Sequence, residues 1–260
     1  MIESATSAVF EPHRIETLSP RISPLNAQTM IEERLPFTVK LVRDEDDLSK
    51  AVQIRHTAYA RHLPDFAETL KRPETADAEN GVVVLLAESK LDGSPLGTMR
   101  IQTNEFKPLS LEQSIELPEW LSKRRLAEAT RLGVTEGKGG RLVTTVLFKA
   151  FYLYCQTVDV EWMVVTGRAP VDRTYDRLLF DDVFPGRGYM PIRHVGNLPH
   201  RVMQFNVNTA EERWAAVRHP LFNFVFRTHH PDMDIAGNGQ TYAPVSKMPV
   251  FTAQGAAFPM

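Results

Sequence analysis

The stretch Leu126-Ala-Glu-Ala-Thr-Arg-Leu-Gly-Val134 decides the fold, because it predicts a strand that leads through a short glycine-rich segment into a long helix. Apolar side chains follow at helical spacing, at Val143, Val146, Leu147, Ala150, Phe151 and Tyr154. Residues 161–167 then predict a second strand. A strand, a helix and a strand in this order favour a right-handed crossover, so we expect the two strands to pair in parallel.

Apolar periodicity and turn residues predict the other elements in the same way. Outward from the central unit they are strands at 37–43, 82–88, 95–102, 189–195 and 201–207, and helices at 44–62, 170–180 and 209–218. Asp44 caps the first helix ahead of an acidic first turn, and residues 103–125 are an irregular insertion. We therefore predict an α/β fold, with a mixed, twisted sheet that carries helices on both faces.

Segments rich in Pro, Gly and Ser flank the patterned part of the 260-residue chain. We expect residues 1–35 to be an N-terminal arm that is partly disordered. Residues 36–218 are predicted to form one domain, and residues 219–260 to be a C-terminal extension and tail.

Composition limits the class of protein. The chain has 30 Lys and Arg against 32 Asp and Glu, and this balance argues against a nucleic-acid-binding protein, which normally has a basic surplus. No apolar run approaches the roughly 20 residues that span a membrane. Glu3 and the lack of an apolar segment after it argue against a signal peptide, and a single cysteine, Cys155, fits a reducing compartment. We predict a cytoplasmic protein.

Two arginines lie where apolar or neutral side chains are expected. Arg55 shares a helical stripe with Leu48, Val52 and Tyr59, so it either forms a structural salt bridge or lines a cleft. Arg100 lies on the second strand of the hairpin, on the face opposite its apolar neighbours. That face is either the wall of a wet cleft or an ordinary solvated surface.

Glu128 and Arg131 lie within the central strand. A spacing of three residues puts their side chains on opposite faces of a regular strand, and a β-bulge between them would bring both to one face. A buried glutamate there needs a partner or a raised pKa, which is the condition for a general base. The alternative is a Glu–Arg pair that only ties the strand to its neighbour.

The segment Glu136-Gly-Lys-Gly-Gly-Arg141 joins this strand to the helix, where free backbone N–H groups attract phosphate. It is not a Walker A loop, because no Lys-Ser/Thr pair follows its second glycine, and it does not match GxGxxG. Short glycine-rich turns before helices are common, so the segment indicates an anion site only together with other signals.

Three further residues offer weaker signals. Tyr175, on helix 170–180, is either an acid for a leaving thiolate or a buried tyrosine bonded to the backbone. His229-His230 does not predict a metal site, since adjacent histidines point apart in an extended segment and no third spaced ligand is evident. Cys155 is predicted to pack rather than to act as a nucleophile.

The order of these motifs resembles a known group of enzymes. Arg55-His-Thr-Ala-Tyr59, Gly97-Thr-Met-Arg100 and Glu128-Ala-Thr-Arg131 are similar to motifs of acyl-homoserine-lactone (autoinducer) synthases and N-acyl amino acid synthases, two families of the GNAT acyltransferase superfamily. Asp77 falls where these families place an acidic residue. Tyr175-x-x-Leu178-x-Phe180 resembles the end of the fourth GNAT helix, with Leu179 in place of glycine. The resemblance covers about residues 37–207.

The resemblance implies a GNAT-like sheet with splayed central strands and an N-acyltransferase activity. A fatty acyl group would pass from an acyl-phosphopantetheine thioester to the amine of an amino acid or similar small molecule. No permanently bound cofactor and no metal are implied. The GNAT phosphate loop is replaced here by the shorter Gly137-Lys-Gly-Gly140, which favours an acyl carrier protein over coenzyme A as donor.

Two alternatives stay open. One is an acyl-homoserine-lactone synthase that uses S-adenosylmethionine. The tryptophan that those enzymes carry near the end of the first helix is absent from Leu63-Pro-Asp-Phe66, which favours an amino acid acceptor. The other is a GNAT-fold binding module without turnover, since fold does not establish function.

The resemblance also implies roles for individual residues. Glu128 would be the general base and Tyr175 the acid for the departing thiolate. The residues expected to bind the acceptor are Arg55, Tyr59, Asp77, Arg100 and Arg131, the last two by holding its carboxylate or by stabilising Glu128. The donor would lie on Val134, Gly137, Lys138, Gly139, Gly140 and Arg141. A basic patch of Lys123, Arg124, Arg125, Lys138, Arg141 and Lys149 would meet the carrier protein; its alternative is a solvated face.

Overall fold

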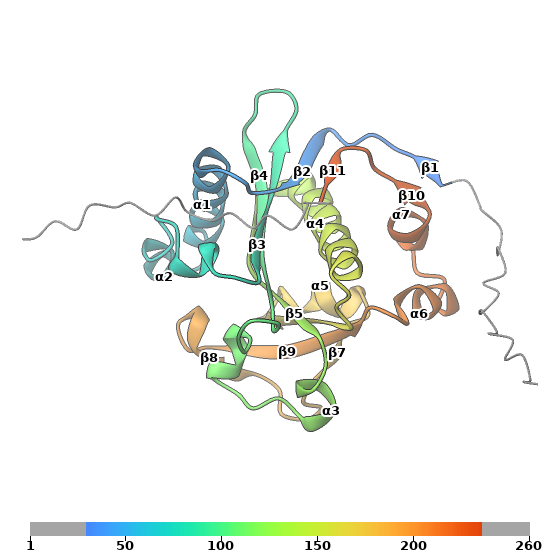
Figure 1. Ribbon diagram of the computed structural model, residues 1–260. Coiled ribbons are helices and arrows are strands. Elements are labelled where there is room, and N and C mark those ends of the chain that lie inside the picture. Colours follow the sequence, from blue (N-terminus) through green and yellow to red (C-terminus); the bar gives the residue numbers. More distant parts are fainter. Residues whose placement is uncertain (1–29, 236–260) are drawn as a thin grey trace, which may run out of the picture. The chain divides into compact units, whose positions relative to one another are not determined.

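The computed structural model describes residues 30–235, which contain a mixed β-sheet (Figure 1). Its strands run in the order β11-β2-β3-β4-β5-β6-β9-β7, and β8 pairs with β9. Their bounds are β2 Phe37–Leu41, β3 Val82–Ser89, β4 Pro95–Thr103, β5 Leu126–Val134, β6 Trp162–Gly167, β7 Asp181–Asp182, β8 Met190–Ile192, β9 Leu198–Asn206 and β11 Met233–Asp234. The pairs β5–β6 and β11–β2 are parallel and the others antiparallel, so the predicted mixed sheet and its parallel crossover are confirmed.

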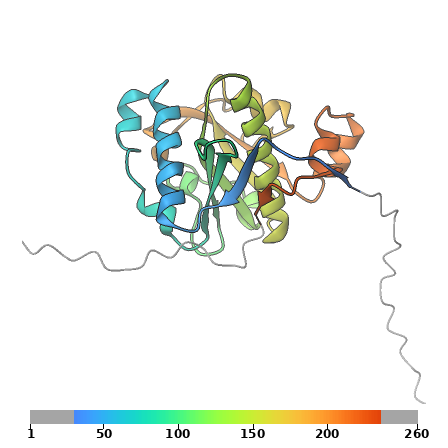
Figure 2. The ribbon, with the colours of Figure 1, turned by 90° about the horizontal axis from the view of Figure 1, so that it is seen from above.

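Helices cover both faces of the sheet, as predicted (Figures 1 and 2). On one face lie α1 (Glu45–Ala60) and α2 (Pro64–Glu68). On the other lie α4 (Gly137–Thr157) and α5 (Asp172–Arg177), followed by α6 (Ala210–Ala216) and α7 (Phe222–Phe226).

The alternation of β4 explains why the two faces differ in chemistry. Met99 and Ile101 are buried in the large core cluster under α4. Thr98 and Arg100 are also buried, and strand geometry puts them on the α1 face. One face of the sheet is therefore an apolar core, and the other carries polar groups under α1.

The first helix begins as its sequence predicts. The side chain of Asp44 accepts a hydrogen bond of 2.8 Å from the Asp47 backbone N–H, and the first turn is acidic. Both features stabilise the free N–H groups of the helix N-terminus. The cap confirms the predicted start of the helix.

Strands β5 and β6 separate halfway along their length. They pair only from Leu126 with Trp162 to Ala129 with Val165, although β5 continues to Val134 and β6 to Gly167. Beyond this point the facing backbone edges have no strand partner within residues 30–235. The predicted splaying of the central strands is confirmed.

A β-bulge, which the sequence left open, lies on β5 between Glu128 and Gly133. Thr98 pairs with Gly133 and Arg100 with Thr130, so β5 has one residue more than β4 in this interval. Arg131, within the bulge, has a φ of 55°, which few residues other than glycine adopt. The extra residue brings the side chains of Glu128 and Arg131 to the same face.

Other boundaries differ from the prediction. Residues 137–140 form the first turn of α4 rather than a loop. A Cβ on Gly140 would lie 1.9 Å from the Thr135 carbonyl oxygen, so the close approach of strand and helix requires glycine there. The strand predicted at 189–195 ends at Ile192 and continues as the 3₁₀ helix η3 (Arg193–Val195).

Several short elements had no clear signal in the sequence. They are α2, α7, β7, β11, the 3₁₀ helices η1 (Thr75–Ala78) and η2 (Ser110–Gln113), the helix α3 (Glu119–Ser122), and the strands β1 (Ile31–Glu32) and β10 (Thr228–His229). The strand β1 pairs with β10, and β11 extends the sheet beside β2. The rest of the predicted arm and tail, residues 1–29 and 236–260, lies outside the described residues, and the division into arm, domain and extension stays a prediction. Within residues 30–235, no helix is both long and apolar enough to cross a bilayer.

Candidate active site

Three arginines from three elements meet two carboxylates on the α1 face of the sheet. Arg55, on α1, donates from Nη1 and Nη2 to the two oxygens of Asp77 at 2.9 Å each. Arg100, on β4, donates to Glu74 at 3.1 Å and to Asp77 at 3.3 Å. Arg131, on β5, donates from Nε and Nη2 to Glu74 at 2.6 Å each. We call these five residues the charged cluster.

The charged cluster settles the environment of Arg55. Its side chain is 0% exposed and bidentate to Asp77, so a buried ion pair balances its charge. Glu74 is shared by all three arginines. Burial alone would raise the pKa of Glu74, but the hydrogen bonds and charge of Arg131 lower that pKa to about 2. Three guanidinium groups against two carboxylates leave the cluster with one excess positive charge.

The turn η1 explains how both carboxylates reach the cluster. The Asp77 side chain accepts a hydrogen bond of 2.9 Å from the Glu74 backbone N–H, which closes a capping box. Residues at this spacing lie on the same side of the turn. Sequence reasoning found Asp77 and missed Glu74, although the Glu-x-x-Asp spacing of a capping box was a signal for it.

Glu128 lies beside the charged cluster and is completely buried. It pairs in register with Gln102 of β4, and its Oε2 accepts a hydrogen bond of 3.1 Å from the Leu111 N–H of η2. Burial raises the pKa of Glu128 to about 7 despite that hydrogen bond and the nearby charges of Arg100 and Arg131. A carboxyl group with this pKa can accept and release a proton near neutral pH.

The side chain of Gln102 places η2 over Glu128. Its amide donates to the Pro108 carbonyl at 2.8 Å and accepts from the Ser110 hydroxyl at 2.8 Å. The insertion 103–125 is thus tied to β4 on the face that carries Glu128. This contact accounts for the complete enclosure of the carboxyl group.

His194 is a neighbour of Glu128 that sequence reasoning missed. Its Nε2 lies 3.5 Å from Glu128 Oε1, and its carbonyl oxygen accepts a hydrogen bond of 2.9 Å from Arg131. Within the described part of the chain, neither ring nitrogen of His194 has a hydrogen-bond partner, and neither has Glu128 Oε1. Burial, together with the charges of Arg131 and Arg100, lowers the pKa of His194 to about 4. The imidazole is therefore neutral at pH 7.

Tyr59 and Phe66 form an aromatic wall next to the charged cluster. Their ring centroids are 5.8 Å apart, and the Arg131 guanidinium lies 5.4 Å from the Phe66 centroid. Phe66 also meets the turn at Gly196, which has a φ of 74°. Phe66 thus links α1, β5 and the segment after η3.

Tyr175 lies at the end of the opening between β5 and β6. Its side chain is buried, and a Cβ on Gly167, the last residue of β6, would lie 3.1 Å from its ring. Burial, and to a smaller degree the Tyr59 phenol, raises the pKa of Tyr175. Tyr59 and Tyr175 come from helices on opposite faces of the sheet, α1 and α5.

The backbone N–H of Val134 is directed toward the same opening. The Thr135 N–H donates to the Leu96 carbonyl at 2.8 Å, so Val134, the preceding residue, directs its N–H away from β4 and toward the side where β6 has separated. Its carbonyl accepts a hydrogen bond of 2.5 Å from Arg61. Lys138 and Arg141 follow on the exposed first turn of α4, and neither forms an ion pair with a described residue.

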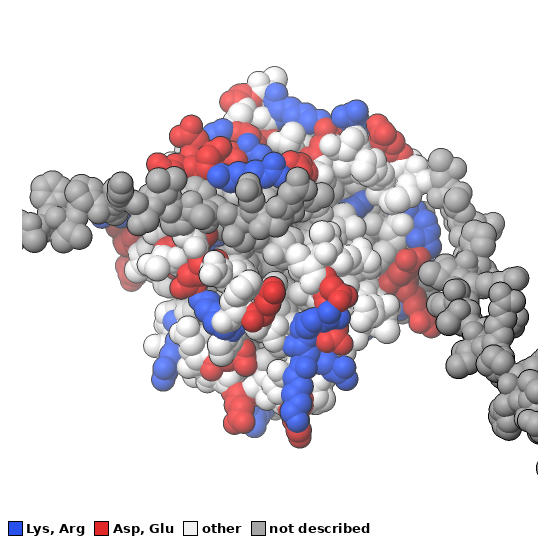
Figure 3. Space-filling model, viewed as in Figure 1, with Lys and Arg blue, Asp and Glu red and all other residues white. Residues whose placement is uncertain are grey.

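The predicted basic patch does not exist as one surface. Lys149 is buried and donates to the Phe224 and Thr228 carbonyls, with His230 Nδ1 at 2.9 Å, so the prediction was wrong for this residue. The cations of residues 123–125 pair with Glu119, Asp159 and Glu161 at the start of β5. Lys138 and Arg141 lie beyond the other end of that strand, about 30 Å away for nine residues. Figure 3 shows basic and acidic side chains intermixed on the face in view.

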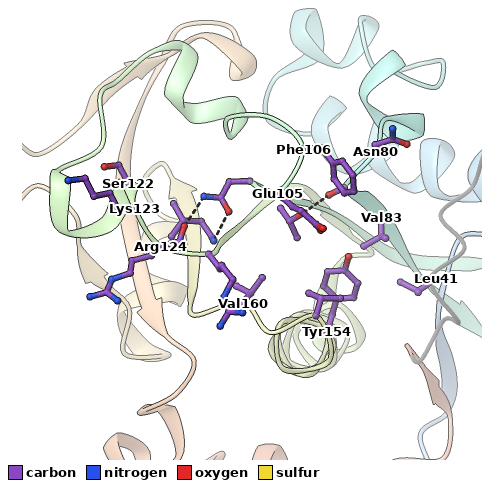
Figure 4. Close-up of a pocket in the computed structure, with 16 residues that line it drawn as sticks. Leu41, Asn80, Val83, Glu105, Phe106, Ser122, Lys123, Arg124, Tyr154 and Val160 are labelled. Atoms are coloured by element: carbon purple, nitrogen blue, oxygen red, sulfur yellow. Dashed lines mark hydrogen bonds between the residues drawn. The ribbon is translucent and has the colours of Figure 1, made fainter.

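A separate cavity of about 730 Å³ lies at the start of β5, away from the charged cluster (Figure 4). Leu41, Val83, Phe106 and Tyr154 line it on one side, and residues 122–125 on the other. None of the predicted catalytic or binding residues lines this cavity.

The fold matches solved acyltransferases. FeeM, an N-acyl amino acid synthase from uncultured soil microbes, matches with a TM-score of 0.54 and 17% identity, over 70% of this chain and 96% of its own. BjaI, a CoA-dependent acyl-homoserine lactone synthase, matches with a TM-score of 0.49 and 16% identity, over 75% and 93%. An N-acetyltransferase from Staphylococcus aureus matches with a TM-score of 0.43 and 10% identity, over 66% and 98%. No protein-family model and no curated protein matches the sequence.

At 17% identity the likeness to FeeM concerns the fold. The chain has the fold of this N-acyl amino acid synthase, and the predicted GNAT-like sheet is confirmed.

Proposed function

We propose that this protein is an N-acyltransferase that moves an acyl group from a pantetheine thioester to the amine of an amino acid or a similar small molecule. One observation carries the proposal: a buried carboxyl group with a pKa near 7, Glu128, lies beside the opening between two splayed strands. The opening supplies backbone N–H groups without strand partners, and Glu128 supplies a base.

The donor is held on β5 and the start of α4. The Val134 N–H, directed toward the opening, donates to the pantetheine arm, and neighbouring free amides polarise the thioester carbonyl as an oxyanion hole does. Lys138 and Arg141 are exposed next to this edge and supply positive charge for the phosphate. The segment Gly137-Lys-Gly-Gly140 is shorter than the GNAT phosphate loop, and this favours acyl carrier protein as the donor. Acyl-CoA is the alternative. Cytoplasmic location is part of the same proposal.

Glu128 takes a proton from the acceptor ammonium so that the free amine can attack the thioester carbonyl. Arg100 and Arg131 lower the pKa of Glu128, and burial raises it more. Arg100 already pairs with Glu74 and Asp77, and Arg131 with Glu74. The two arginines therefore act on Glu128 through their charge rather than by holding the acceptor carboxylate. Arg55 and Asp77 hold Arg100 and Glu74 in place, and Tyr59 forms part of the acceptor wall.

Collapse of the tetrahedral intermediate forms the C–N amide bond and breaks the C–S bond. The departing thiolate takes a proton from the phenol of Tyr175, whose ring lies against the last residue of β6. The resulting phenolate takes the second proton from the attacking nitrogen, so Tyr175 returns to its neutral form. The first proton, removed from the acceptor ammonium, resides on Glu128 and leaves to water when the product departs. Proton and electron pair are thus accounted for without a metal or redox cofactor in the proposed step.

The proposal is tested with the purified full chain. The chain is offered long-chain acyl carrier protein or acyl-CoA as donor, with a panel of amino acids or S-adenosylmethionine as acceptor, and the products are identified by mass spectrometry. We expect an N-acyl amino acid, and we expect Glu128→Gln to lower kcat by about 100-fold or more. A homoserine lactone product would instead support the synthase that uses S-adenosylmethionine. No acylated amine with any donor, or full activity of Glu128→Gln, would contradict an enzymatic role.

A further inference from the structure

Arg168 follows the last residue of β6, at the edge of the opening. Along β6, Met163 and Val165 pack in the core under α4, whereas Val164 packs on the opposite face. Val164 pairs in register with Glu128, so the two side chains share that face. Strand alternation continues through Thr166 to Arg168. The Arg168 side chain therefore leaves β6 on the face that carries the proposed base.

The guanidinium of Arg168 lacks a counter-charge in residues 30–235. Its Nη1 atom is buried and has no hydrogen-bond partner, and no described carboxylate lies within ion-pair distance of it. Arg55, Arg100 and Arg131, in contrast, are all paired with Glu74 or Asp77. A buried guanidinium atom without a partner is costly, and a bound anion would supply the missing partner.

Two histidines connect Arg168 to Glu128 across the same face. The β6–β9 register pairs Thr166 with Val202 and Gly167 with Arg201, so its continuation sets Arg168 beside His200 on that face. Arg168 accordingly helps burial to lower the pKa of His200. Farther along the face, His194 lies 3.5 Å from Glu128. Glu128 and Arg168 thus mark the two ends of one polar strip. Unpartnered buried atoms, Glu128 Oε1, the His194 ring nitrogens and Arg168 Nη1, occur along it.

We propose that Arg168 binds the carboxylate of the acceptor and selects amines that carry one. The inference rests on the proposed function and names the class of acceptor, an amine that carries a carboxylate. The amine faces Glu128, and the paired N–H donors of the Arg168 guanidinium hold the carboxylate. The donor phosphate is the other anion in the reaction. It belongs at the start of α4, on the face of the sheet opposite to Arg168.

The test compares an amino acid that the wild-type chain acylates with the carboxamide of the same amino acid. We expect Arg168→Gln to raise KM for the amino acid on the order of 10- to 100-fold, with KM for the acyl donor unchanged. The wild-type protein should prefer the acid to the amide, and Arg168→Gln should abolish that preference. Arg173→Gln, at an exposed arginine on α5, is the matched control. It should leave the KM for the amino acid, the KM for the acyl donor and the preference for acid over amide unchanged.

Two outcomes overturn the inference. One is a raised KM for the donor, which assigns Arg168 to the donor phosphate; the other is an equal loss with acid and amide, which assigns it a structural role. Where Arg168→Gln does not fold, Arg168→Lys keeps the charge without the fork, and an unchanged acid preference in that variant also overturns the inference. Failure of the proposed function is distinguishable, because the wild-type chain would then acylate neither acceptor.

Discussion

His194 Nε2 lies 3.5 Å from Glu128 Oε1, in a site where both side chains are buried and Arg131 holds the His194 carbonyl. This separation is longer than a formed hydrogen bond, but at this distance the ionisation of one group affects the other. The histidine is neutral at pH 7, so its N–H can stabilise Glu128 when that carboxyl group loses its proton. The pair links the 3₁₀ turn after β8 to the proposed catalytic strand.

Replacement of His194 should change the pH profile of the reaction. In His194→Phe the ionised Glu128 loses a nearby donor, so its pKa rises further. We expect the acid limb of kcat/KM to move to higher pH, with activity reduced near neutral pH and regained in more alkaline buffer. His62→Phe, at an exposed histidine after α1, should keep the wild-type profile. An equal loss at every pH would contradict the coupling and indicate only a packing defect.

The wild-type enzyme should gain activity through neutral pH. The base is Glu128 in its ionised form, and burial raises the pKa of this group to about 7. We therefore expect kcat/KM to rise with pH and to be half-maximal near pH 7. Measurement across pH 5 to 9, with a donor stable over that range, checks the expectation. A rate that is flat from pH 5 upward would show that a carboxyl group with an ordinary pKa is the base.

Glu128→Gln should stabilise the fold above neutral pH although it removes activity. A carboxyl group whose pKa is raised by folding contributes stability that is fully present below its unfolded pKa, 4.5, and is lost as pH rises through about 7. The neutral glutamine avoids this loss, by up to about 3 kcal/mol at pH 8. Thermal unfolding at pH 8 and pH 4 checks the sign: the gain in Tm should appear only at pH 8. Glu116→Gln, at an exposed residue, should show no such difference.

Glu74→Gln should destabilise the protein, with the opposite dependence on pH. The substitution leaves Arg131 and Arg100 without their shared carboxylate, at a cost of about 3 kcal/mol for a buried pair. Because the pKa of Glu74 is lowered by folding to about 2, its contribution is present above pH 4.5 and lost as pH falls through about 2. Denaturant unfolding at pH 7 and pH 2.5 should show the difference shrinking in acid. Glu68→Gln, which removes the exposed ion pair with Lys71, serves as control. An equal loss of unfolding free energy in this variant would contradict the stabilising role of Glu74.

Gly140→Ala should disrupt the junction between β5 and α4. The added Cβ would meet the Thr135 carbonyl oxygen at 1.9 Å, which the backbone can relieve only by moving. We expect a loss of a few kcal/mol in unfolding free energy and a raised KM for the acyl donor. Gly139→Ala, where the nearest atom would be 4.0 Å away, should fold normally and be no less stable. Similar behaviour of the two variants would show that the close approach is not maintained in solution.

Local features of the fold could be predicted from the chain because they depend on neighbours in sequence. Side-chain periodicity predicted β5 and α4, and Asp44 predicted the start of α1. The bulge stayed an open alternative, because it depends on the register with β4. The sequence predicted a loop at residues 137–140, which form the first turn of α4, because glycine disfavours helices. The close contact of Gly140 with Thr135 overrides that preference, and only the packed strand provides this contact.

By itself the sequence determined the longer helices and strands, their order and the polar face of β4. Only the tertiary structure decided which charges pair. It placed Glu74 between Arg100 and Arg131, brought His194 to Glu128 and left Arg168 Nη1 without a partner among the described residues. The physical reason is that periodicity and capping act over one or two turns of chain, whereas these contacts join segments far apart in sequence. Their geometry exists only once the sheet has assembled and excluded water from its α1 face.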